Sequence, residues 1–315
     1  MIAFLDFEKP VAELQARIAE LRESADSGGA DIAAELTKLE AKADKMLADT
    51  YARLTPWQKT QVARHPDRPH FKHYSARLFD DFVPLAGDRN FGEDFAIMGG
   101  FARFRGRRIM VIGHEKGDDT TSRLKHNFGM GKPEGYRKAI RLMQLADRFG
   151  LPVVTLVDTS GAFPGIVAEE RGQAEAIARS TEACLSLGVP MVAAILGEGG
   201  SGGAVALSAA NHVMMMEHAV YSVITPEGCA SILWRTADKA ADAAEAMRIT
   251  ADDLAALKVI DTIVKEPVGG AHRSPDSAID EVGKQIELAL ESLGSSTPVQ
   301  LRADRRRKFL AMGAL

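Results

Sequence analysis

Two similar stretches of sequence, FGLPVVTLVDTSGAFPG at 149–165 and LGVPMVAAILGEGGSGG at 187–203, predict the centre of the fold. Each has a Gly-x-Pro start, a wholly apolar strand and a glycine-rich segment, and a helical pattern follows. Strands that are apolar on both faces belong to parallel sheets covered by helices. The repeat therefore predicts adjacent parallel strands with a glycine-rich loop at the carboxyl end of each, where ligands bind in such sheets.

The N-terminal region has a different pattern. From about Pro10 to Arg53, apolar residues recur at helical spacing, and SADSGGAD (24–31) interrupts them, which predicts two helices in a hairpin. We divide the chain into a helical hairpin and connector at 1–75 and a main domain at 76–315. The segment 63–74, ARHPDRPHFKHY, holds two prolines and is expected to be irregular and solvated, which disfavours a metal site at its histidines.

Other elements follow from local patterns. Alternating apolar residues at 95–104 and 108–115, joined by RGR, predict a β-hairpin. A helix is expected to begin at Pro133, and its buried stripe consists of Ala139, Leu142, Met143, Ala146 and Phe149. The run Met214–Met216 is expected to be a core strand.

Composition narrows the functional class. The 315 residues are 46% hydrophobic and carry a formal net charge of −4, which is typical of a soluble enzyme and does not indicate nucleic-acid binding. The two cysteines, Cys184 and Cys229, form no CxxC pattern, so neither a zinc ribbon nor a disulfide framework is indicated. With no targeting segment and no apolar run long enough to span a bilayer, we expect a cytoplasmic protein without membrane contact.

The segment GEGGSGGA (197–204) fits two known motifs by spacing. As a dinucleotide fingerprint, its glycines would bind a pyrophosphate, and Glu217 would hold the ribose. As a nucleophile elbow, Ser201 would attack a substrate, with Asp261 and His272 completing a triad and His212 and His218 as other candidate bases. Both are disfavoured: the connecting helix is short for the first, and eight histidines supply such an order by chance for the second.

A third interpretation uses the backbone alone. Without side chains, Gly202 and Gly203 can present two N–H groups to one ligand oxygen near the start of a helix, whose dipole adds positive potential. Such an arrangement is an oxyanion hole. The alternative is that the glycines merely allow tight packing between neighbouring segments.

Longer motifs reveal a resemblance. The stretches DTSGAFPG…AEERGQAEAIARS (158–180), GEGGSGGA and YSVITPEGCASILW (221–234) resemble the α subunits of bacterial acetyl-CoA carboxylase carboxyltransferases. The resemblance runs from FLDFEKP near the start almost to the C-terminus and implies an α/β, crotonase-like fold, a spiral of ββα turns with an N-terminal helical extension. Ser160 stands where the family usually has proline, and Phe163 where it has tyrosine; neither departure removes a functional group.

The resemblance also implies a reaction. In this family a carboxyl group moves from N1 of biotin, held on a biotin carboxyl carrier protein, to the methyl carbon of acetyl-CoA, giving malonyl-CoA, the first committed intermediate of fatty acid biosynthesis. The hole for the biotin ureido oxygen then falls on the N–H groups of Gly202 and Gly203. The substrate-binding residues are expected to be Gly161, Gly165, Gly199 and Gly200.

The expected partners follow from the same resemblance. A β subunit carries the thioester oxyanion hole and the zinc, and two α chains assemble with two β chains. Biotin carboxylase and the carrier protein complete the ATP-dependent enzyme, while this chain holds no metal and no covalently bound cofactor. The alternative is a non-catalytic scaffold that only docks a partner. The basic clusters RFRGRR (103–108) and RADRRRK (302–308) are expected to be solvated.

Overall fold

A computed structural model of the chain describes residues 3–25 and 30–313. Its centre is a mixed sheet in the order β1-β2-β3-β4-β5-β6-β8, with β7 paired to β5 beside this path. The strands are β1 (Asp80–Pro84), β2 (Ile97–Phe104), β3 (Arg107–His114), β4 (Val153–Thr159), β5 (Met191–Gly200), β6 (His212–Met216), β7 (Val220–Ser222) and β8 (Thr262–Val264).

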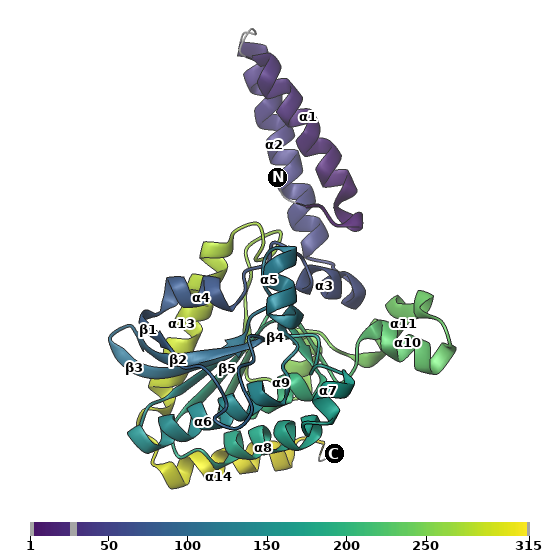
Figure 1. Ribbon diagram of the computed structural model, residues 1–315. Helices are drawn as coiled ribbons and strands as arrows, with labels where there is room; N and C mark the ends of the chain where they lie inside the picture. The colour runs from purple at the N-terminus through teal and green to yellow at the C-terminus, as the bar shows by residue number, and fades with distance from the viewer. Residues whose placement is uncertain (1–2, 26–29, 314–315) are drawn as a thin grey trace.

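Helices surround this sheet. In Figure 1, α6 and α8 lie next to each other below the sheet and α13 passes behind it. The helices are α1 (Lys9–Ala25), α2 (Ala30–Tyr51), α3 (Pro56–Ala63), α4 (Phe71–Leu78), α5 (Thr120–Lys125), α6 (Pro133–Phe149), α7 (Ile166–Glu169), α8 (Gln173–Ser186), α9 (Ser201–Ser208), α10 (Pro226–Trp234), α11 (Ala240–Met247), α12 (Ala251–Ala256), α13 (Pro275–Leu293) and α14 (Pro298–Ala311).

The repeated units form the parallel centre of the sheet, as predicted. β4 pairs in parallel with β5, and the first half of β5 pairs in parallel with β6, whose methionines are buried. One detail differs: the glycines that we expected in a loop after β5 continue the strand as far as Gly200, and α9 begins at the next residue. The strand is longer because Glu198–Gly200 pair with Val220–Ser222 of β7, which provides partners for backbone groups that a loop would leave to water.

The two predicted N-terminal helices are present as α1 and α2, and Figure 1 shows them projecting from the rest of the molecule. Of the expected break at 24–31, residues 26–29 lie outside the described residues. The division of the chain between 75 and 76 stays a prediction. Phe71 and Tyr74, on its N-terminal side, belong to the main hydrophobic core.

The prediction for segment 63–74 is half right: residues 64–70 form no helix or strand, as expected, but the segment is not solvated. His65, Arg68 and His70 are buried rather than solvated, and α4 begins within the segment, at Phe71. The charges are tolerated because they have partners: Arg68 donates to the carbonyl oxygen of Leu196 and pairs with Glu266 at 2.6 Å. The composition of a short segment does not show which distant residues will pair with its charged side chains.

The hairpin and the helix at Pro133 are confirmed as β2–β3, antiparallel around Arg105 and Gly106, and as α6. In the predicted buried stripe Phe149 is the exception, because it is 59% exposed; its ring lies edge-on to that of Phe101. The strand β1 and the helix α5 were not predicted. Among the described residues, no helix is long and apolar enough to cross a membrane.

The C-terminal basic cluster is only partly solvated, contrary to expectation. Arg305 is fully buried and donates to the carbonyl oxygens of Cys184, Leu187 and Val189 around the end of α8. The last carbonyls of a helix have no partner within it, so a guanidinium stabilises them there. Arg305 thereby fastens α14 to α8.

The turn that ends α6 provides a first testable prediction. Gly150 has φ +65, and a methyl group there would meet no atom within 4 Å, so only backbone strain opposes a side chain. Gly150→Ala is expected to lower the free energy of unfolding by about 1 kcal/mol. Urea denaturation measures this, and an unchanged midpoint would contradict the left-handed geometry.

Candidate active site

The two glycine-rich segments meet at the carboxyl ends of β4 and β5. A methyl group placed on Gly200 would lie 2.2 Å from the carbonyl carbon of Ser160, and one on Gly203 would lie 2.8 Å from the amide nitrogen of Ala162. The backbone of 160–162 therefore rests directly on Gly200 and Gly203. Packing alone already requires glycine at both positions.

The two glycines that we expect to act as donors lie at the start of α9. Gly202 and Gly203 are the second and third residues of the helix, and the first four N–H groups of a helix have no intrahelical acceptor. The N-cap, Gly200, provides no side-chain acceptor for them. Gly202 is half-buried and Gly203 buried, so Gly202 is the easier of the two for a ligand to reach.

The other predicted binding glycines have different surroundings. Gly161 has φ +150, and a methyl group there would have the Gly200 carbonyl oxygen as its nearest neighbour, at 4.0 Å. A methyl group on Gly199 would lie 2.7 Å from the ring of Tyr221, and one on Gly165 would lie 2.3 Å from the ring of Phe163. The structure thus gathers Gly161, Gly199 and Gly200 beside the start of α9, whereas Gly165 serves as the N-cap of α7.

A cleft opens beside these glycines. A cavity of about 220 Å³ is lined by the segment before α4, by residues that follow β3, and by Ser160 and Glu198. Ser160, Glu198 and Arg64 also line a small adjoining recess, together with Gly199 and Gly200. The cleft therefore lies at the carboxyl edge of the sheet, as predicted for this class of fold.

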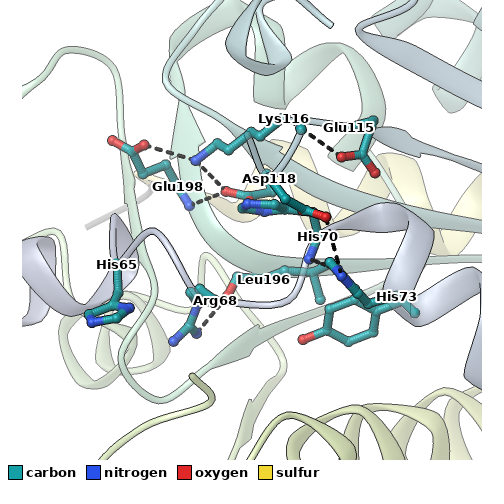
Figure 2. A network of polar contacts seen from close by, with 12 residues as sticks. His65, Arg68, His70, His73, Glu115, Lys116, Asp118, Leu196 and Glu198 are labelled. Atoms are coloured by element: carbon teal, nitrogen blue, oxygen red, sulfur yellow. Dashed lines mark hydrogen bonds and ion pairs between the residues drawn. The ribbon is translucent and has the colours of Figure 1, made fainter. Parts of the chain in front are cut away.

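The wall of the cleft is a chain of ion pairs. Lys116 Nζ lies 2.7 Å from Asp158 Oδ1 and 3.0 Å from Glu198 Oε2, and Figure 2 shows the lysine reaching across to Glu198. Arg64 continues the chain, with its Nε 2.7 Å from Glu198 Oε1 and its Nη1 2.5 Å from Glu227 Oε1. Five segments are thereby linked around the ends of β4 and β5.

These groups keep their charges at neutral pH. Burial alone would lower the pKa of Lys116, but Asp158 and Glu198 outweigh it and raise the pKa to about 12. Burial would likewise raise the pKa of both carboxyls, yet Lys116 beside them holds each pKa below its ordinary value. Lys116 is therefore protonated and cannot act as a base near pH 7.

The two motif interpretations of GEGGSGGA lack support in the structure. Asp261 pairs with Lys308, and His272 stacks on His65 with ring centroids 3.8 Å apart, so no hydrogen bond joins the proposed triad. Ser201 lies at the strand-to-helix junction with φ +51. This backbone geometry is typical of a nucleophile elbow, but the catalytic partners that an elbow needs are not beside it. Glu217, the candidate ribose ligand, pairs with Lys265.

The histidines of segment 63–74 have structural partners. His70 Nδ1 lies 3.3 Å from Asp158 Oδ2, and His73 Nδ1 accepts from the amide of His70. Within residues 3–25 and 30–313, no group of three or more His, Cys, Asp and Glu side chains is arranged to hold a metal ion.

Comparison with known proteins assigns the family. A family model described as acetyl co-enzyme A carboxylase carboxyltransferase-like matches residues 4–313. Two relatives called acetyl-coenzyme A carboxylase carboxyl transferase subunit alpha are similar over their whole lengths. The one from Sphingopyxis alaskensis is 73% identical and covers 99% of both chains; the one from Rhizorhabdus wittichii is 72% identical and covers 99% of this chain and 100% of its own. The chain belongs to this α-subunit family.

Family membership carries the function. The chain is a carboxyltransferase subunit of acetyl-CoA carboxylase, a biotin-dependent enzyme, and the family's reaction is carboxyl transfer to acetyl-CoA, which yields malonyl-CoA for fatty acid biosynthesis. The resemblance seen in the sequence is therefore confirmed.

Solved structures confirm the predicted crotonase-like fold. A transcarboxylase 12S structure superposes with a TM-score of 0.59 at 21% identity and covers 73% of this chain and 42% of its own. A Pseudomonas malonate decarboxylase hetero-tetramer superposes with a TM-score of 0.55 at 16% identity and covers 69% and 88%. At such identities the likeness shows the fold alone.

The ion-pair chain of this α subunit was not predicted from the sequence. Glu198 lies inside the glycine-rich segment GEGGSGGA, among residues whose small size dominates the pattern. The available signal was a carboxylate near the end of each apolar strand, Asp158 in β4 and Glu198 in β5. Lys116 follows β3 in an unremarkable HEKGDD stretch and carries no comparable mark.

Proposed function

We propose that the backbone N–H groups of Gly202 and Gly203 stabilise the negative charge on the biotin ureido oxygen when the carboxyl group leaves. Three features support this: their place in the first turn of α9, the lack of a side-chain cap, and the partial exposure of Gly202. Preorganised N–H donors act most strongly on charge that develops during a reaction. Gly161, Gly199 and Gly200 shape the adjoining floor, and Gly165 fixes the start of α7.

The site is proposed to be completed by a second subunit. Large apolar side chains are exposed on the elements near the glycines: Ile166 and Val167 on α7, Val223 after β7, and Ile232 and Leu233 on α10. Clustered exposed apolar residues mark protein interfaces. In Figure 1, α10 and α11 project from the rest of the molecule, where a partner can reach them.

The finer composition of the enzyme is also proposed. The partner is a zinc-bearing β subunit that supplies the thioester oxyanion hole, in an assembly of two α and two β chains. The carrier protein presents biotin, biotin carboxylase loads it, and acetyl-CoA is the acceptor. A cytoplasmic location suits the free thiols of Cys184 and Cys229. We propose no nucleic-acid or membrane partner.

Reconstitution tests this proposal. The chain is co-purified with its β partner and assayed for carboxyl transfer between malonyl-CoA and biotin in both directions. We expect turnover that requires both chains. Turnover by the β chain alone would instead identify this chain as a scaffold.

A further inference from the structure

Two buried carboxylates lie next to the glycine segments and have no role in the proposed chemistry. Asp158 and Glu198 lie near the carboxyl ends of the two neighbouring strands, and their side chains are 2% and 11% exposed. They also approach each other closely, since the amide of Glu198 donates to Asp158 Oδ1 at 2.9 Å. Two ionised carboxylates in a poorly solvated place repel strongly unless a cation lies between them.

Lys116 is that cation. It comes from the segment after β3, its side chain is 15% exposed, and its ammonium contacts a carboxylate oxygen of each strand. Arg64 contacts the other oxygen of Glu198, but its second partner is Glu227 rather than Asp158. Within the described residues, Lys116 is therefore the basic side chain that pairs with both strand ends.

The backbone segments that follow Asp158 and Glu198 are packed so closely that they cannot move relative to each other without losing this contact. Ser160 follows Asp158 by two residues, and Gly200 follows Glu198 by two. A methyl group at Gly200 would already overlap the Ser160 carbonyl. If the strand ends separate, the backbone of 160–162 shifts against Gly203 and the N–H groups of α9 lose their direction. Misplacing a reacting group by about 1 Å can cost about a hundredfold in rate.

We propose that Lys116 is a positioning residue, whose ammonium neutralises Asp158 and Glu198 and so holds the two glycine segments in the register that forms the oxyanion hole. This inference rests on the proposed function. Lys116 contacts no substrate in this account and transfers no proton.

The test compares purified αβ enzymes. Lys116→Met is expected to lower kcat by about ten- to a hundredfold, with KM for acetyl-CoA changed by less than about threefold. The matched control is Lys138→Met, which removes a lysine of α6 that is 2% exposed and so more deeply buried than Lys116; it pairs with Glu93 and donates to the carbonyl oxygen of Asp94. The control is expected to lower the melting temperature at least as much and to keep kcat within about threefold.

A compensating variant separates positioning from substrate contact. In Lys116→Met/Glu198→Gln only one of the two carboxylates keeps its charge, so the repulsion disappears and kcat is expected to recover at least about fivefold over Lys116→Met. Absence of recovery, or equal loss in Lys138→Met, would overturn the proposal. If Lys116→Met does not fold, the double variant is compared with Glu198→Gln; kcat values within about threefold support the proposal, and a larger drop contradicts it.

The two proposals fail differently. If the wild-type αβ enzyme has no transferase activity, the proposed function is wrong. If the wild-type enzyme is active and Lys116→Met matches it, the positioning role alone is wrong.

Discussion

Gly203→Val is expected to lower carboxyl transfer by at least about 10²–10³-fold, the usual cost of losing one oxyanion-hole donor. Even the first carbon of the new side chain would lie 2.8 Å from the backbone of Gly161 and Ala162, so the start of α9 must move. The moved N–H groups no longer face the charged oxygen. Steady-state assays of the αβ enzyme measure the loss.

The neighbouring serine provides the contrast. Ser201 is exposed, and its hydroxyl is not needed in the backbone account. Ser201→Ala is therefore expected to keep kcat within about threefold. If Ser201→Ala were as inactive as Gly203→Val, the nucleophile-elbow interpretation would replace the backbone one.

Arg68→Met is expected to destabilise the chain by about 3–5 kcal/mol, because it leaves the Glu266 carboxylate buried without its cation. The two side chains are 1% and 0% exposed and 2.6 Å apart. Arg68 also donates to the Leu196 carbonyl oxygen in β5, so the variant loosens the strand that leads into α9 and Gly202. Denaturant titration measures the change.

A surface pair is the control for this variant. Arg179 lies 3.1 Å from Glu175 on α8, and both side chains are more than half exposed. Arg179→Met is expected to change stability by less than about 0.5 kcal/mol. Equal effects of the two variants would mean that the Arg68 pair is not buried as described.

The same buried pair predicts a pH dependence. Burial would raise the pKa of Glu266, but Arg68 outweighs it and lowers the pKa to about 2, from 4.5 when unfolded. A depressed carboxyl pKa stabilises the fold above about pH 4.5, and this stabilisation, about 3 kcal/mol, is lost as pH falls toward 2. The acid-induced loss should shrink in Arg68→Met.

The sequence predicted those parts of the molecule that local patterns encode. The two apolar strands with their Gly-x-Pro starts led to β4 and β5, to their parallel pairing and to the meeting of the glycine segments. Proline at the start of α6 and glycine at its end defined that helix. Periodicity and turn residues act over a few positions, and there the prediction succeeded.

The rest depended on partners far away in the chain. Lys116 and Glu198 are 82 positions apart, and Arg64 and Glu198 are 134 apart, so no local pattern pairs them. Segment 63–74 reads as solvated for the same reason, since its buried Arg68 meets Glu266 across 198 positions. A charged residue reads as a surface residue when its partner lies far away in the chain.

Substitution at Gly202 tests the central claim most directly, because one variant removes the N–H group and another keeps it. A methyl group there meets only the flexible side chain of Ile177, at 3.2 Å, and proline is tolerated in the first turn of a helix. The comparison requires that the two variants have similar melting temperatures. Gly202→Ala is then expected to keep kcat within about fivefold of the wild-type value, whereas Gly202→Pro is expected to lower kcat by about 10²–10³-fold. Equal kcat in the two variants would contradict a role for the backbone N–H in catalysis.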